Sequence, residues 1–171
     1  MSLNIIILAA GNGKRMHSAL PKVMHKVGGK PMLEHVLISA KKLNPKSINV
    51  VINSKIESIK SSFTDYNIKW HNQIEQKGTA DAVKTVLPNL GVKEKVLILY
   101  ADTPLIDSLL LKTFINYMPE SDVKVLTVEL NNPYGYGRII REQAEEEIIS
   151  KIIEETEADE IQKNIKAHYQ T

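Results

Sequence analysis

The fold is decided by a stretch close to the N-terminus, Asn4-Ile5-Ile6-Ile7-Leu8-Ala9-Ala10-Gly11-Asn12-Gly13-Lys14-Arg15-Met16. Its first half is apolar and rich in β-branched residues without alternation, which is typical of a central strand covered on both faces. Its second half is a glycine-rich turn that ends in two cations. Ligands of open α/β sheets gather at the carboxyl ends of the strands, so this turn is a candidate phosphate-binding loop.

The glycine loop favours a phosphate site for a physical reason. Gly11 and Gly13 let the backbone turn sharply and bring amide N–H groups close to phosphate oxygens, while Lys14 and Arg15 add positive charge. Two familiar phosphate motifs do not fit. The third glycine of a Rossmann fingerprint would fall at Met16, and no Ser or Thr follows the Gly-Lys pair as a Walker loop requires. A tight turn with two solvated cations is the alternative.

Composition bounds the class of protein. A chain of 171 residues, 43% of them hydrophobic, is long enough for a sizeable core, and we expect a single domain over residues 1–171. The net charge of +2 is too small to indicate a nucleic-acid partner. There is no cysteine, which excludes disulfides and thiolate chemistry. No apolar run approaches the ~20 residues that cross a bilayer, so we expect no membrane partner and a cytoplasmic location.

Strands and helices alternate along most of the chain, which indicates an α/β domain with a mostly parallel sheet. The expected strands lie at 5–9, 48–52, 67–71, 95–100 and 123–129, and the expected helices lie at 31–43, at 55–63, after Gly78 and Thr79, and at 108–118. A hairpin is expected over 138–142 and 148–153. The strand over 95–100 repeats the apolar pattern of the first strand. The helix over 108–118 is expected to bury Leu110, Leu111, Phe114, Ile115 and Met118.

Two charged residues are placed where they could act on an anionic ligand. Lys22, in the Pro-stiffened loop Leu20-Pro21-Lys22-Val23, follows the glycine loop closely enough to reach a phosphate as a point charge. Asp102 stands where the apolar strand over 95–100 ends abruptly in a carboxylate, a placement suited to Mg²⁺ shared with substrate phosphates. The alternatives are a surface lysine and a turn aspartate beside Pro104.

Two further segments have the composition of ligand-binding loops. In the segment from Gln73 to Ala80, the Gln73 amide could contact a base edge, and Gly78 and Thr79 mark a helix start that favours an anion or a polar ligand. Helix capping explains Thr79 equally well. In Pro133-Tyr134-Gly135-Tyr136-Gly137-Arg138-Ile139-Ile140, the closely spaced glycines allow backbone amides to contact a sugar ring, or they form a flexible entry to the hairpin.

Taken together, these segments resemble the uridylyltransferase domain of the bifunctional GlmU family, over residues 4 to about 165. The glycine loop and the Lys22 loop are shared with many nucleotidyltransferases, whereas residues 100–105 and 135–139 point to this family. The resemblance implies a Rossmann-like sheet of the nucleotidyltransferase type. It also implies transfer of UMP from UTP to N-acetylglucosamine-1-phosphate, with Mg²⁺, giving UDP-N-acetylglucosamine and pyrophosphate for peptidoglycan and lipopolysaccharide precursors.

The resemblance also implies roles for individual residues. Arg15 would stabilise the triphosphate in the transition state, Lys22 would neutralise charge, and Asp102 would hold Mg²⁺. Residues implied to contact the uridine nucleotide or its phosphates are Leu8, Ala9, Ala10, Gly11, Gly13, Lys22, Gln73, Gly78 and Thr79. Residues implied to lie beside or hold the sugar are Tyr100, Ala101, Gly137 and Glu154.

The chain departs from the family pattern at several positions. Ala101 stands where the family usually has Gly, and Glu155-Thr156 stand where a His-Lys pair is common. An Asn-Thr-Gly sugar segment is replaced by residues 167–171, and a later asparagine of the metal site is not reached. We therefore expect a C-terminally truncated domain without the β-helix acetyltransferase domain on which trimer formation in the family depends.

Three other functions remain open from the sequence. The chain could be a nucleotidyltransferase for another sugar phosphate or alcohol phosphate, although the 135–139 segment argues against it. It could be a nucleotide-binding module without turnover, which the missing C-terminal ligands favour. It could be a regulatory domain that reuses the fold, which the intact Gly11, Gly13, Arg15, Lys22 and Asp102 argue against.

Overall fold

The computed structural model describes residues 2–11, 13, 16–75, 77–117, 122–142 and 148–169. These residues form two compact units, Met1–Tyr117 and Met118–Thr171, and each is described by itself. The catalytic residue expected at Arg15 lies outside the described residues. The single-domain organisation expected from chain length stays a prediction.

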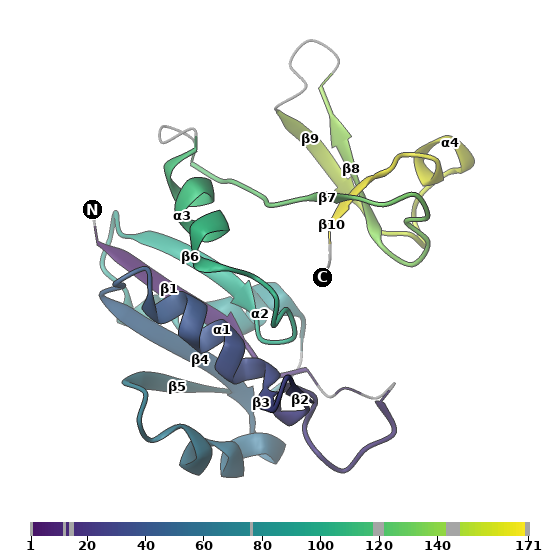
Figure 1. Cartoon of the computed structure of the whole chain (residues 1–171). Coiled ribbons are helices and arrows are strands. Elements are labelled where there is room, and N and C mark those ends of the chain that lie inside the picture. Colours follow the sequence, from purple (N-terminus) through teal and green to yellow (C-terminus); the bar gives the residue numbers. More distant parts are fainter. Residues whose placement is uncertain are drawn as a thin grey trace. The chain divides into compact units, whose positions relative to one another are not determined.

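The first unit is built on a parallel four-stranded sheet (Figure 1). Its strands are β1 (Leu3–Leu8), β4 (Ser47–Asn53), β5 (Ile68–Gln73) and β6 (Lys95–Tyr100), in the order β5-β4-β1-β6. All three strand pairs are parallel, which confirms the expected sheet. β1 lies between β4 and β6 and has four consecutive buried residues, as its unbroken apolar run predicts.

Helices cover both faces of this sheet. The helix α1 (Met32–Lys41) and the helix α3 (Ser108–Asn116) pack on the face of Ile5 and Ile7, through Leu33, Leu37 and Leu111. Figure 1 shows α1 lying across that face. The short helix α2 (Thr79–Lys84) packs on the opposite face, where Ile6 meets Ala82. Because strand side chains alternate, neighbouring isoleucines of β1 serve two separate cores.

Short elements complete the first unit. The segment expected as a helix over 55–63 is the 3₁₀ helix η3 (Ser54–Phe63). Two shorter 3₁₀ turns are η2 (Lys22–Met24) and η4 (Leu87–Asn89). The hairpin of β2 (Lys26–Val27) and β3 (Lys30–Pro31) leads into α1. Pro31 is the N-cap of α1, and its fixed φ suits the position before a helix starts.

The face under α2 carries a chain of polar side chains that the apolar strand patterns did not predict. Asn4 Nδ2 donates to Glu94 at 2.8 Å, and Asn4 Oδ1 accepts from Ser47 at 2.7 Å. Asn49 then donates to Ser47 at 2.9 Å and meets the His71 ring at 3.0 Å. Hydrogen bonds from Lys46 and then from the Gly91 amide lower the pKa of Glu94 to about 2. The side chains of Asn4 and Asn49, both buried, therefore have hydrogen-bond partners, and both of them bond to Ser47.

The strand expected over 95–100 is confirmed as β6, whereas the face expected to be buried in α3 was wrong in detail. β6 has Leu97 and Leu99 buried, but Val96 and Ile98 are 40% and 44% exposed, because β6 is the edge strand and α2 does not cover it. In α3, Leu111 is buried whereas Leu110 is exposed, so the buried face is narrower than expected. Phe114 and Ile115 are partly buried, and Met118 lies outside the described residues.

The second unit is an antiparallel sheet with one short helix. Its strands are β7 (Val128–Glu129), β8 (Gly137–Arg141), β9 (Ile149–Ile153) and β10 (Ala167–Tyr169), in the order β7-β10-β8-β9. The predicted hairpin is confirmed as β8–β9, with a register shift between Ile140 and Arg141. The short helix α4 (Glu160–Lys163) has a capping box between Asp159 and Gln162. The Asp-x-x-Gln spacing of residues 159–162 is a sequence signal for a helix start, and sequence reasoning did not use it.

The strand expected over 123–129 was wrong. Only Val128–Glu129 form a strand, and Val123 is 81% exposed. A segment with high β-propensity needs a neighbouring strand, and in the part of the chain that the structure describes only β10 pairs with this segment, at its end. No helix among the described residues is long and apolar enough to cross a membrane.

Candidate nucleotide-binding site

The carboxyl edge of the parallel sheet brings together most of the residues predicted to contact a nucleotide. β1, β5 and β6 end there at Leu8, Gln73 and Tyr100. β1 and β6 stay in register past their ends, because the Ala101 amide donates to the Leu8 carbonyl at 3.0 Å. The glycine loop and Asp102 therefore leave the sheet side by side. This is the edge at which ligands of open α/β sheets bind.

An ion pair joins the two charged residues predicted for the site. Lys22 Nζ lies 2.5 Å from Asp102 Oδ2, although the residues are 80 positions apart in the sequence. Their side chains are 36% and 22% exposed, so both charges can be reached from solvent. The lysine of the Pro-stiffened loop and the carboxylate after β6 are therefore neighbours in the structure.

Gly13 is the tightest point of the glycine loop. Its φ of +58° is a left-handed conformation, and a Cβ built on it would lie 2.8 Å from the Cβ of Lys22. The Gly13 carbonyl also accepts a hydrogen bond from the Met16 amide at 2.9 Å. Gly11 has open space where its side chain would be. The backbone conformation at position 13 therefore favours glycine, and because glycine has no Cβ, Lys22 can approach the loop closely.

The two residues that precede Asp102 are shielded from solvent to different degrees. Ala101 is fully buried, and its methyl group belongs to the core under α1, so it does not crowd the ligand side of the edge. Tyr100 is half-buried, and its burial, followed by the charge of Asp102, raises the pKa of its phenol. Thr103 donates to the Tyr100 carbonyl at 2.8 Å and fixes the turn that presents Asp102.

Gln73 holds the start of α2. Its side chain is 4% exposed, and Nε2 donates to the Gly78 carbonyl at 3.1 Å and to Asp81 Oδ2 at 2.9 Å. Gly78 is the N-cap of α2, with a φ of 108° and no side-chain cap, so the capping explanation for Thr79 was wrong. Thr79 is exposed at the helix start. Its role in binding a nucleotide stays a prediction.

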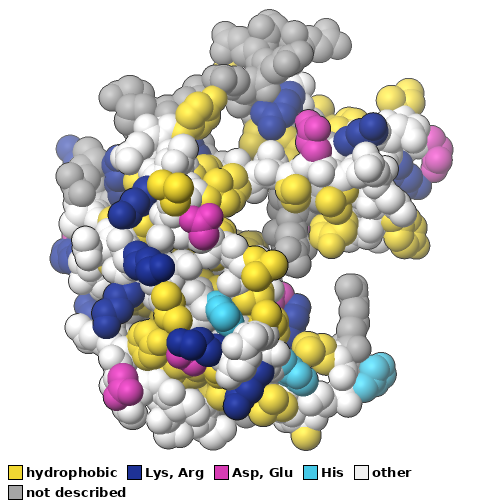
Figure 2. All heavy atoms as spheres, in the orientation of Figure 1, with side chains coloured by type: hydrophobic (Ala, Val, Ile, Leu, Met, Phe, Trp, Pro, Cys, Tyr) yellow, Lys and Arg dark blue, Asp and Glu magenta, His cyan; other side chains and the backbone are white. Residues whose placement is uncertain are grey.

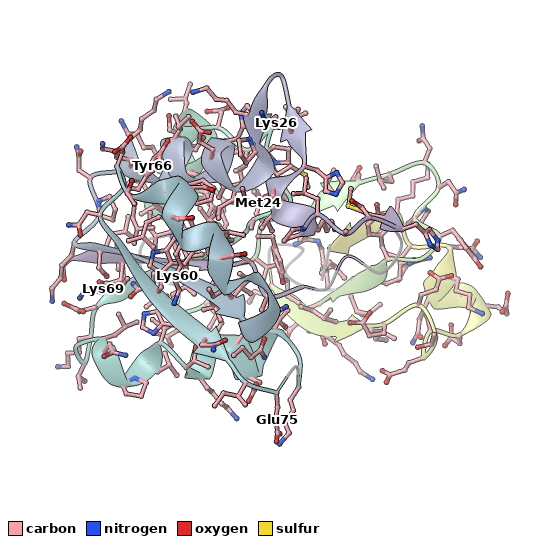
Figure 3. The ribbon with its side chains drawn as sticks, turned by 90° about the horizontal axis from the view of Figure 1, so that it is seen from below. Met24, Lys26, Lys60, Tyr66, Lys69 and Glu75 are labelled. Carbon is pink, nitrogen blue, oxygen red and sulfur yellow. The ribbon has the colours of Figure 1, made fainter. Side chains whose placement is uncertain are left out.

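The loop between β5 and α2 extends away from the sheet. Figure 3 shows Glu75 of this loop pointing outward, at the opposite side of the ribbon from Lys26 of the β2–β3 hairpin. Lys77 pairs with Glu75 within the loop. Figure 2 shows lysine and histidine side chains gathering over the β2–β3 hairpin and the start of α1.

Sequence reasoning missed Asn53, the last residue of β4. Its side chain is 5% exposed, and Nδ2 donates to the Ala10 carbonyl at 2.7 Å. That bond fixes the peptide from which the glycine loop starts. The signal was similar to the one that identified Asp102, a polar residue at the carboxyl end of an apolar strand.

We expect Asn53→Ala to weaken binding of nucleoside triphosphate and to lower stability by about 1–2 kcal/mol, because the buried hydrogen bond from Asn53 to the Ala10 carbonyl would be lost. Urea unfolding and calorimetric titration with UTP would measure both effects. Asn67→Ala is the matched control, since Asn67 is an exposed residue of the same unit. An Asn53→Ala protein as stable as the control variant would contradict this role.

Two of the four residues predicted to lie beside or hold the sugar, Gly137 and Glu154, belong to the second unit. Arg138 pairs with Ile153 across the β8–β9 hairpin. Gly137 precedes Arg138 and Glu154 follows Ile153, so both residues adjoin this pair. Gly137 is buried and Glu154 is exposed.

Comparison with known proteins identifies the family. The sequence matches the MobA-like NTP transferase domain over residues 5–167. The chain belongs to this family. The MobA-like domain here is 42% identical over 167 residues to the bifunctional protein GlmU of Buchnera aphidicola, covering 98% of this chain and 36% of that protein. It is 44% identical to the GlmU protein of Nitrosomonas europaea, covering 97% of this chain and 36% of that protein. The resemblance found in the motifs is confirmed.

Solved structures confirm the nucleotidyltransferase fold of this MobA-like domain. A putative glucose-1-phosphate thymidylyltransferase from Bacillus anthracis matches with a TM-score of 0.79 at 19% identity, over 98% of this chain and 68% of that chain. A UDP-glucose pyrophosphorylase complexed with UDP-glucose matches with a TM-score of 0.75 at 19% identity, over 98% of this chain and 74% of that chain. The chain spans about 36% of the length of the curated GlmU relatives that it matches.

Proposed function

We propose that this protein transfers UMP from UTP to N-acetylglucosamine-1-phosphate, giving UDP-N-acetylglucosamine and pyrophosphate. The observation that carries the proposal is the Lys22–Asp102 ion pair, which stands beside the glycine loop at the carboxyl edge of the sheet. The identity to GlmU proteins over nearly the whole chain supports the choice of uridine nucleotide and amino sugar. A cytoplasmic location, expected from the sequence, stays a prediction.

The residues at the edge fit Mg²⁺ delivered with a nucleotide. Among the described residues there is no cluster of three or more His, Asp or Glu side chains that would form a metal cage. Mg²⁺ commonly takes one or two carboxylates and completes its shell with substrate phosphates and water. Asp102 would supply the carboxylate, and the ion would neutralise charge on the phosphates when bound.

The protein's own groups would bind and orient the triphosphate. Lys22 and Asp102 neutralise each other in the structure. With Mg²⁺ and UTP present, Lys22 would turn to a phosphate oxygen while Asp102 keeps a cationic partner, so neither charge is left unpaired. The backbone amides of Gly11 and Gly13 would contact the phosphates, and Arg15 would add charge on the same loop.

The reaction needs positioning more than acid–base chemistry. An oxygen of the sugar phosphate, already an anion, attacks the α-phosphorus of UTP in line. The new O–P bond forms as the bond to the β-phosphate oxygen breaks, and pyrophosphate leaves with that electron pair. Holding both anions together against their repulsion is the main task, and fixed cations and amides perform it. Gly137 and Glu154 would hold the sugar.

We expect the protein to bind UTP more tightly than ATP by about tenfold or more, because a base-reading role for the Gln73–Thr79 segment implies a site that fits the single ring of uracil and excludes the larger purine. Calorimetric titration of each nucleotide with Mg²⁺ measures the preference. CTP, which differs from UTP only on the base edge, is the matched control. Equal affinity for UTP and ATP would contradict the base-reading role of this segment.

A further inference from the structure

A buried guanidinium lies within the sheet of the second unit. Arg138, on β8, has a side chain that is only 2% exposed. Its Nε and Nη2 both donate to the Lys163 carbonyl at 3.2 Å, and its Nη1 donates to the Tyr136 carbonyl. A cation without access to water is costly to bury unless an anion compensates it. The mechanism proposed above for binding UTP, Mg²⁺ and the sugar phosphate gives no role to Arg138.

Glu155 supplies the compensating charge. Its Oε2 lies 2.7 Å from Arg138 Nη2, and its side chain is 21% exposed. Oε2 is buried and accepts no aligned hydrogen bond from the described residues, so the contact is a close charge–charge contact. Each group therefore compensates the charge of the other, and removing one would leave the other as an uncompensated charge.

The pair joins the two positions predicted to hold the sugar. Arg138 directly follows Gly137, and Glu155 directly follows Glu154. Gly137 and Glu154 directly flank the Arg138–Ile153 pair, which is the end of the β8–β9 ladder. The Glu154 carbonyl accepts hydrogen bonds from the amides of Glu157 and Ala158, both at 3.0 Å, which turns the chain away from the sheet.

We propose that the Arg138–Glu155 ion pair is a positioning device for the sugar phosphate, which fixes the Glu154 carboxylate opposite the Gly137 backbone. This inference rests on the proposed function. Gly137 is the first residue of β8, whereas Glu154 follows the last residue of β9 and is not held by the strand ladder. An anchor one residue further along restricts where its carboxylate can lie. Such restriction improves binding by reducing the ordering that the ligand must impose.

The test compares affinity for N-acetylglucosamine-1-phosphate with affinity for UTP, each measured by calorimetry with Mg²⁺. Glu155→Gln keeps the side chain's shape and removes its charge. We expect it to weaken sugar-phosphate binding by about tenfold while UTP binding changes by less than about twofold. Glu155→Asp keeps the charge but shortens the reach, and we expect a smaller loss. Glu157→Gln is the control, an exposed acid in the same turn that should change neither affinity.

The outcomes separate this inference from the proposed function. Wild-type protein that binds UTP but not the sugar phosphate would contradict the proposed function and this inference with it. Wild-type protein that binds both, with Glu155→Gln binding the sugar phosphate equally well, would contradict this inference alone. Equal loss of both ligands in Glu155→Gln would show a general role in folding and would also overturn it. If Glu155→Gln does not fold, Glu155→Asp decides by the same comparison.

Discussion

Replacing Asp102 by Asn is expected to lower turnover by at least about a hundredfold, because the amide keeps the shape of the side chain but cannot supply an anionic ligand to Mg²⁺. Folding should be little affected. The Lys22–Asp102 pair is partly exposed, and such pairs contribute about 1 kcal/mol or less. Initial rates of pyrophosphate release at several Mg²⁺ concentrations measure the effect, and thermal unfolding measures the stability.

Asp65→Asn is the matched control for this experiment. Asp65 is an exposed acid of the same unit, in the turn that follows η3. The same loss of charge there should leave the rate within about twofold of wild type. If Asp102→Asn turned over as fast as Asp65→Asn, the assignment of Asp102 as a metal ligand would be wrong.

Replacing Gly13 by Ala is expected to damage the site in two ways. The positive φ costs about 1–2 kcal/mol for a residue with a Cβ. The new Cβ would also meet the Lys22 Cβ at 2.8 Å, so the lysine and its loop must move. We therefore expect affinity for UTP to fall by about tenfold or more. Calorimetry and urea unfolding measure the two effects.

Gly28→Ala separates these two causes. Gly28 has nearly the same backbone conformation, with a φ of +55°, but open space where its Cβ would lie. The Gly28→Ala protein should therefore lose stability because of its backbone conformation, but it should bind UTP with unchanged affinity. Equal UTP affinity in Gly13→Ala and Gly28→Ala would show that the approach of Lys22 to the glycine loop does not matter for binding.

The part of the fold that could be predicted is the part with local signals. The unbroken apolar run of β1 predicts a central strand, which the structure has, and the glycines after it predict a tight turn, which the positive φ of Gly13 supports. Asp102 was found because a carboxylate interrupts an apolar strand. Asn53 also stands at the carboxyl end of an apolar strand, and its hydrogen bond to the Ala10 carbonyl shows that this position could have been identified in the same way.

The rest depended on which strands become neighbours, and no local pattern encodes that. Lys22 and Asp102 are 80 positions apart, so their ion pair follows only from the order β4-β1-β6 and the loops at its edge. β6 has the apolar pattern of a central strand but lies at the edge of the sheet. Residues 123–127 have the composition of a strand but have no strand partner in the part of the chain that the structure describes.

The most direct test of the central claim is pyrophosphate release by this protein from UTP with Mg²⁺, with and without N-acetylglucosamine-1-phosphate. We predict release that requires the sugar phosphate and yields UDP-N-acetylglucosamine in equal amount, with glucose-1-phosphate a poorer acceptor. UTP binding without any release of pyrophosphate would contradict the account and identify a nucleotide-binding module. Release that does not depend on a sugar phosphate would contradict it as well.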